Sequence, residues 1–325
     1  MNSFAGEHNL SEVGRNQQAD PDRTTVSELG HAISGPSAED AAVEAWAQDY
    51  IRFDNLPAWQ RELRTEIRRR CRQLQPSKNE VLHATFRGRK HARSDVENLL
   101  FYNIDSFKES GRNGIRFEQG SDALPADEHA DYRFGYRYAL APRSGTFYHW
   151  QRGRPLASFD WTDLGTFAGE KKLAQVWLAL WRSDVQVLDL AEPGTNFGVR
   201  VQVHPPTDRE PVLGGLLKGI FDGVICALQN HTDTSVLPRV AERLATMLPA
   251  GPTEIEEHLL DPSRAVLGPV PRLVTPYGKG VKWDPSDHRC VAGELLAAES
   301  TAPQLGDRWA IKGEVFELVR APTSR

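Results

Sequence analysis

The stretch SDVENLLFYNIDSF, residues 94–107, decides the fold because it combines a helical apolar pattern with three acidic residues. It lies between two segments that are strand-like by composition, VLHATF (81–86) and GIRFE (114–118). The apolar residues that share one helical face are Val96, Leu99, Leu100, Ile104 and Phe107. The pattern predicts a strand–helix–strand unit.

A second set of segments follows the same order later in the chain. VRVQV (199–203) precedes GLLKGIFDGV (215–224), which aligns without gaps on NLLFYNIDSF (98–107), and GVKWD (280–284) aligns on GIRFE. The second copy needs a long insertion between its helix and its closing strand, and apolar helices also share leucines by chance. The segments indicate two diverged copies of one unit, a pseudo-dimer within a single chain.

The rest of the chain sets the domain plan of a mixed α/β (α+β) protein. Residues 1–36 are polar without apolar periodicity, which predicts a disordered tail. Residues 37–76 predict a helical lead-in of two helices, the first capped by Ser37 and the second beginning at Pro57. The first α/β unit then covers 77–190 and the second covers 191–325.

Composition limits where the protein acts and what it binds. No apolar run reaches membrane-spanning length and the N-terminus lacks a signal-peptide layout, so we expect a cytoplasmic protein without a membrane partner. The net charge is −5, but residues 61–100 carry 11 basic and 5 acidic side chains. Non-selective nucleic-acid binding by the whole surface is therefore disfavoured, whereas local binding is not.

The motif DVENL, residues 95–99, carries a family resemblance. It is similar to the D-x-D-N-L element at a helix start in the RusA-type Holliday-junction resolvases, which have a lysine three residues after the Asn, an aspartate seven after it, and a later strand that ends in acids. Here Asp105 has the aspartate spacing and Glu118 the position where the acidic pair begins. The resemblance implies a small dimeric α/β endonuclease that cuts branched DNA with Mg²⁺.

The sequence departs from this family in each copy at a different place. Glu97 replaces the second aspartate, Phe101 replaces the lysine, and Gln119 replaces the second member of the acidic pair. In the second copy Lys218 has the lysine position, but the D-x-D-N element is lost. A working site would therefore combine residues of both copies.

The hypothesis that follows is a Mg²⁺-dependent nuclease-like protein or a protein that binds branched or duplex nucleic acid. Carboxylate oxygens suit Mg²⁺, so Asp95, Glu97 and Glu118 are the predicted metal ligands, with Asp95 and Glu97 also catalytic. Lys218 is the predicted phosphate contact. The residues predicted to bind the nucleic-acid backbone are Arg68, Arg69, Arg87, Arg89, Lys90 and Arg93.

Simpler interpretations account for the same residues. Asp95 or Ser94 caps a helix and Glu97 occupies its first turn, which would give a catalytically silent scaffold that binds a protein partner. The segment DPSDHRC (284–290) is interpreted as a polar loop. A third class is an enzyme with a small-molecule pocket lined by the aromatic cluster, which comprises Tyr132, Phe134, Tyr136, Tyr138, Phe147, Tyr148 and Trp150.

Overall fold

The computed structural model describes most of the chain in detail. The described residues are 25–27, 30–52, 54–90, 94–101, 107–122, 132–167, 172–207, 209–298 and 306–322. Within them, no helix is both long enough and apolar enough to cross a membrane.

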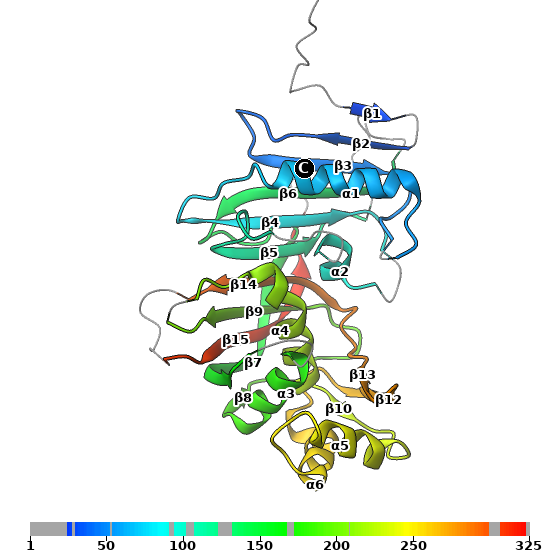
Figure 1. Ribbon diagram of the computed structural model, residues 1–325, viewed down its shortest axis with the longest axis vertical. Helices are drawn as coiled ribbons and strands as arrows, with labels where there is room; N and C mark the ends of the chain where they lie inside the picture. The colour runs from blue at the N-terminus through cyan, green and yellow to red at the C-terminus, as the bar shows by residue number, and fades with distance from the viewer. Residues whose placement is uncertain are drawn as a thin grey trace, which may run out of the picture.

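One mixed sheet of eleven strands runs through the described part of the molecule (Figure 1). Its spatial order is β1-β2-β3-β6-β4-β5-β14-β9-β15-β7-β8. The strands are β1 (Thr25–Ser27), β2 (His31–Ser34), β3 (Ala42–Ala47), β4 (Glu80–Arg87), β5 (Gly114–Gln119), β6 (Phe134–Pro142), β7 (Trp150–Gly165), β8 (Val185–Val187), β9 (Phe197–His204), β14 (Cys290–Ala297) and β15 (Trp309–Arg320). The predicted mixed α/β class is confirmed.

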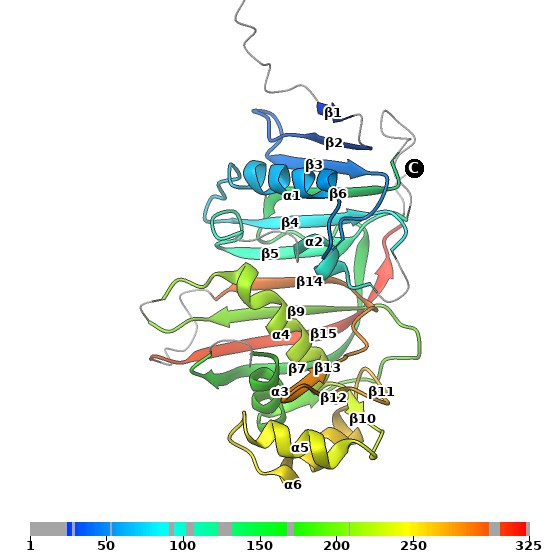
Figure 2. The ribbon, with the colours of Figure 1, turned by 45° about the vertical axis from the view of Figure 1, so that its right-hand side comes forward.

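Four helices cover one side of this sheet, which we call the helix face (Figure 2). They are α1 (Ala58–Cys71), α2 (Val96–Phe101), α3 (Lys172–Arg182) and α4 (Leu213–Ala227). Alternate strand residues such as Ile115 and Phe117 join the core beneath them, because successive side chains of a strand point to opposite sides. The opposite side of the sheet, here the second face, carries Arg116 and Glu118.

Read outward from the pair of β5 and β14, the strand directions are the same on both sides, although the first side has one strand more. In the first unit β6 and β4 are antiparallel and β4 and β5 are parallel, with α2 in the crossover. In the second, β15 and β9 are antiparallel and β9 and β14 are parallel, with α4 in the crossover. The two units meet at the seam, where β5 and β14 pair antiparallel. The pseudo-dimer stays a prediction.

The N-terminal part differs from its prediction. Residues 42–47 form β3 instead of a helix, because β2 and β6 pair with both edges of the segment and bury Val43 and Ala45. Ser37 accepts hydrogen bonds from the amides of Glu39 and Asp40, which closes a turn and starts no helix. Residues 25–27 and 31–34 are strands although the whole of 1–36 was predicted to be disordered. Only α1, after Pro57, matches the predicted lead-in.

The second unit also differs in two places. Residues 280–283 form β13, which pairs only with β12 (Val274–Tyr277) in a small separate sheet, so the closing strand equivalent to β5 is β14. β7 and α3 were predicted in the first unit, yet β7 pairs with β15 and α3 packs against α4.

The long insertion between α4 and β14 forms a satellite beside α3 and α4. Its elements are β10 (Asn230–His231), α5 (Leu237–Ala245), α6 (Pro252–Leu260), β11 (Pro269–Val270), β12 and β13. A separate apolar cluster joins it to the helix layer through Trp177 of α3 and Cys226 of α4. The insertion therefore lies outside the main sheet and leaves the symmetric order of the strands intact.

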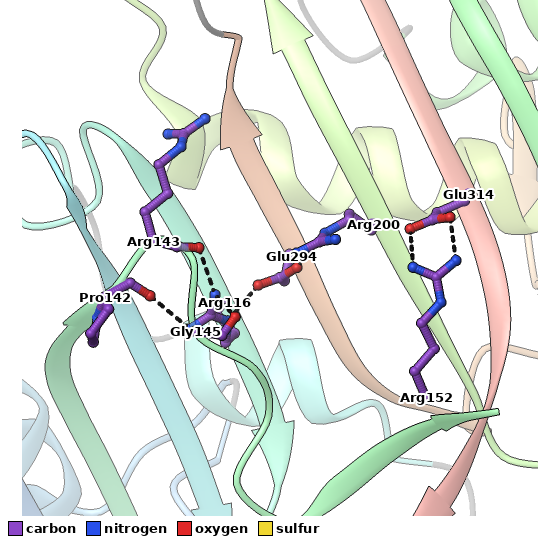
Figure 3. A network of polar contacts seen from close by, with 8 residues as sticks. All are labelled: Arg116, Pro142, Arg143, Gly145, Arg152, Arg200, Glu294 and Glu314. Atoms are coloured by element: carbon purple, nitrogen blue, oxygen red, sulfur yellow. Dashed lines mark hydrogen bonds and ion pairs between the residues drawn. The ribbon is translucent and has the colours of Figure 1, made fainter.

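A buried ion pair joins the two units on the second face (Figure 3). The Arg116 guanidinium of β5 and the Glu294 carboxylate of β14 are hydrogen-bonded, with side chains only 1% and 3% exposed. The remaining Arg116 donors bond the carbonyl oxygens of Pro142, Arg143 and Gly145 in the connection from β6 to β7. Arg116 thus fixes both the seam and the loop that covers it.

Candidate functional site

A cavity of about 490 Å³ lies beside the start of α2 and the middle of α4. Its walls include Asp95 from the start of α2, Lys218 and Asp222 from α4, and Asp287 from the segment that enters β14. Together with Glu97 of α2, which contacts Lys218, these residues form the carboxylate–lysine cluster. The cluster is built from three parts of the chain. More than a hundred residues separate α2 from α4.

Local structure places each member of the cluster. The Asp95 carbonyl accepts the first helical hydrogen bond of α2, from the Leu99 amide, and the Asp95 carboxylate accepts a 2.6 Å bond from the Asn98 side-chain amide. Lys218 and Asp222 are four residues apart on α4, which puts them on one side of that helix. Asp95 therefore occupies the predicted helix-cap position, while its side chain faces the cavity.

Close packing brings α4 onto the seam. A side chain at Gly293 of β14 would lie 2.3 Å from the Phe221 ring and 2.8 Å from the Phe117 ring. Only glycine fits there, so the helix approaches the strands closely. This contact holds Asp222, the next residue after Phe221, at the mouth of the cavity.

Lys218 connects the acids of the two units. Its Nζ lies 3.1 Å from Asp222 Oδ2 and 3.6 Å from Glu97 Oε2. The Lys218 side chain is 43% exposed, whereas those of Glu97 and Asp222 are 12% and 14% exposed. The ammonium group therefore faces solvent with two largely buried carboxylates behind it.

Burial and crowding shift the pKa values of the cluster. Burial, together with Asp222 and Asp95, raises the pKa of Glu97 to about 7 against the opposing effect of Lys218. Burial and the neighbouring Asp95 raise the pKa of Asp222. For the same two reasons the pKa of the Asp287 carboxyl rises to about 9. Burial opposes the charge of Lys218, but Glu97, Asp222 and Asp95 raise its pKa.

The cluster holds more negative charge than its own cations neutralise. Asp95 Oδ1 is buried and has no hydrogen-bond donor among the described residues, and the Asp287 carboxyl is close enough to hydrogen-bond with Asp95. Two facing carboxylates need a shared proton or a cation between them. Chemically, the site can therefore hold a proton near neutral pH or attract a positively charged group.

Glu118 does not join Asp95 and Glu97. It lies on the second face, because Phe117 beside it faces the core under the helices. Its carboxylate accepts bonds from the Tyr148 and His149 amides at 2.9 and 2.8 Å and lies 2.9 Å from His83 Nε2. Burial alone would raise the pKa of Glu118, but the bonds from His149 and His83 lower it to about 2.

The predicted backbone-binding residues are dispersed. Among those in the described residues, Lys90 lies near the cluster, where its Nζ donates to the carbonyl oxygens of Ser94 and His288, and burial lowers its pKa. Arg69 of α1 pairs with Glu66, and Arg87 lies 3.7 Å from Glu44. The remaining members are Arg68 on α1, the exposed Arg89, and Arg93, which with Asp105 lies outside the described residues.

Most of the aromatic cluster is structural. Tyr136 and Tyr138 are buried on the helix face, where their hydroxyl groups bond the Ile51 amide and the Leu100 carbonyl. Phe147, Tyr148 and Trp150 instead lie along the second face, beside a different cavity. Phe134, Tyr136 and Tyr138, at alternate positions of β6, all pack against the core under the helices.

No family model, curated protein or solved structure matches this chain. Any functional assignment therefore depends on the geometry of the cluster.

Replacement of Asp287 by Asn should stabilise the protein at alkaline pH in the presence of a chelator. A carboxyl whose pKa is higher in the folded than in the unfolded chain stabilises the fold while protonated, and this stabilisation is lost as pH rises from about 4 to about 9. Asn keeps the neutral form. We expect the variant to exceed wild type by about 5 kcal/mol in free energy of unfolding at about pH 8 and by nearly nothing at about pH 4.

Thermal melting across that pH range would measure the difference. Asp160→Asn, an exposed carboxylate on the second face whose pKa is lowered by Lys312, is the control and should give no gain in stability at alkaline pH. Parallel profiles for wild type and Asp287→Asn would contradict the shared-proton geometry.

Proposed function

We propose that this protein is a Mg²⁺-dependent nuclease-like protein that acts on branched or duplex nucleic acid at the carboxylate–lysine cluster. One observation supports it above all others. Acids from α2 of the first unit lie beside Lys218 from α4 of the second, with 3.6 Å between Lys218 Nζ and Glu97 Oε2. In this proposal the other copy supplies the lysine that α2 lacks at Phe101.

The donor chemistry fits a hard divalent cation. The cluster offers carboxylate oxygens, including the buried and unbonded Asp95 Oδ1. No three Asp, Glu, His or Cys side chains in the described part of the chain are arranged as a ready-made metal site. Mg²⁺ usually takes one or two carboxylates and fills its other positions with water and phosphate oxygens, so Asp95 and Asp287 would be sufficient protein ligands.

The side chains of the cluster have distinct roles in hydrolysis. Lys218 binds the scissile phosphate as a point charge, and Glu97, with a pKa of about 7, accepts a proton from the attacking water near neutral pH. The water oxygen bonds to phosphorus, the ester P–O bond breaks, and the leaving oxygen takes a proton from solvent. When bound, Mg²⁺ supplies charge stabilisation for the attacking and leaving oxygens.

The RusA resemblance belongs to the same proposal. The two units with a common strand order would be diverged copies of a subunit that is otherwise dimeric. The cluster keeps Asp95 and Glu97 from the motif, takes Lys218 from the second copy, and uses Asp287 in place of Glu118. This division of roles accounts for the loss of different motif residues in each copy.

A catalytically silent scaffold is the second candidate, and two observations favour it. The described residues hold no preassembled metal ligand set, and Arg69 and Arg87 are engaged by Glu66 and Glu44. A scaffold would keep the fold and bind a protein partner. It would not bind Mg²⁺ at the cluster.

Thermal melting with and without millimolar Mg²⁺ or Mn²⁺ separates the two candidates. We expect the metal to raise the melting temperature of the wild type by about 2–5 °C, since a ligand that binds only the folded state stabilises it. Asp95→Asn should lose this rise, whereas Asp160→Asn, an exposed carboxylate on the second face, should keep it. Equal responses in all three proteins would overturn the metal site.

A further inference from the structure

A second cavity, of about 510 Å³, lies on the face of the sheet opposite the carboxylate–lysine cluster. We propose that it binds a small planar aromatic anion, a molecule with one or two fused rings and a carboxylate or an equivalent negative group. The walls that carry the inference are aromatic and cationic: Phe147, Trp150, Phe316, Arg152, Arg200 and Glu294. This site is separate from the proposed nuclease site and does not depend on it.

The aromatic walls are held in place by their surroundings. Trp150 is 4% exposed, and its Nε1 donates a 2.7 Å bond to the Gln119 carbonyl. Phe316 is buried with the Arg152 guanidinium 4.6 Å from its ring centroid. Phe147 packs against the same apolar cluster but stays partly exposed. A rigid apolar wall of this kind favours a flat ring over a flexible chain.

The charges at this cavity are not balanced. Within the described residues, Arg116, Arg152 and Arg200 meet two carboxylates, those of Glu294 and Glu314 (Figure 3). Glu294 serves two of the arginines, because it accepts from Arg116 and also from Arg200 Nε at 2.5 Å. Arg152 is already paired through both terminal nitrogens with Glu314. One positive charge therefore remains without a counterion.

Arg200 is the residue that holds this free charge. Only its Nε is bonded within the described part of the chain, and its side chain is 37% exposed at the cavity wall. The two terminal nitrogens of its guanidinium remain available, in the planar fork geometry that suits a carboxylate or phosphate. An anionic group bound there would leave its ring against the partly exposed Phe147, beside Trp150, whose ring already has the Arg320 guanidinium 4.2 Å from its centroid.

The site is organised before any ligand arrives. Glu294 fixes the Arg200 guanidinium at Nε, and buried Arg116 fixes both Glu294 and the Gly145 carbonyl at the rim. Little side-chain entropy would be lost on binding, which favours measurable affinity for a small ligand.

Isothermal titration with two probes of the same shape tests the inference. The probes are 2-naphthoate, a planar anion, and 2-naphthylmethanol, its neutral counterpart. We expect the wild type to bind naphthoate at least about tenfold more tightly than the alcohol, about 1.4 kcal/mol. Arg200→Gln should remove that preference. Lys312→Gln, which deletes another half-exposed cation on this face, should keep it.

Each outcome decides the inference. Equal affinity for the two probes, or a naphthoate preference that survives in Arg200→Gln, would overturn it, and so would no heat up to about 5 mM naphthoate. Phe147→Ala gives a second check, because it should weaken both probes while preserving their ratio. The metal-melting result for Asp95→Asn is independent of every one of these measurements.

Discussion

Arg116→Met is expected to lower the free energy of unfolding by about 3–5 kcal/mol, the range for breaking a buried ion pair by removing one partner. The substitution leaves the Glu294 carboxylate almost fully buried, with only Arg200 as a partner, and removes the donors for Pro142, Arg143 and Gly145. Both the seam between β5 and β14 and the covering loop lose their common support. Urea unfolding at neutral pH would measure the change.

Arg152→Met is the matched control for this prediction. Arg152 makes a two-point ion pair with Glu314 on the same face, but its side chain is 42% exposed. Exposed pairs contribute at most about 1 kcal/mol, so this variant should lose far less stability. If both variants lost the same amount, burial would not be the source of the effect, and the central role of Arg116 would be contradicted.

Asp95→Asn should reduce Mg²⁺-dependent cleavage of branched DNA by at least about 100-fold, because loss of a metal ligand removes several kcal/mol of transition-state stabilisation. The fold should survive the change, since Asn keeps the hydrogen-bonding shape of Asp and relieves the repulsion with Asp287. Cleavage of a labelled four-way junction, followed on denaturing gels, is the measurement.

Lys218→Met and Asp160→Asn complete that experiment. Lys218→Met removes the phosphate contact and should weaken cleavage while leaving the metal-induced rise in melting temperature. Asp160→Asn lies on the second face and should cleave as the wild type does. If the wild type cleaves no DNA with Mg²⁺ or Mn²⁺, the scaffold function is favoured over the nuclease function. If Asp95→Asn cleaves as fast as the wild type, the active site lies elsewhere.

The sequence predicts the parts of the fold whose patterns are local. The strand of 80–87 and the helix of 58–71 lie where composition and periodicity place them. Residues 42–47 do not, because alanine and glutamate favour a helix until β2 and β6 supply hydrogen bonds on both sides. Tertiary pairing overrides local propensity there. The segment GVKWD is wrong for the opposite reason. It forms a strand as predicted, but that strand pairs with β12 and does not join the main sheet.

Three residues that the sequence singled out lie together in the structure. Asp95 and Lys218 line one cavity and Glu97 contacts Lys218, because α2 and α4 pack against each other. Glu118 does not meet them, and the alternation of Ile115, Arg116 and Phe117 already carried the signal that it faces the other side. Asp287 had no local signal, because an insertion of dozens of residues separates it from α4 and only the fold returns it to the cavity.

Because both units belong to one chain, the contact between Glu97 and Lys218 is maintained when the protein is diluted. Subunits of an ordinary dimer part when they are diluted, whereas Glu97 and Lys218 are tethered by one backbone at a fixed effective concentration. The contact between Glu97 and Lys218 therefore forms within one molecule and does not depend on the protein concentration. A tethered pair is also released from the constraint that one gene imposes on two identical subunits, so one half can keep acids while the other keeps a lysine.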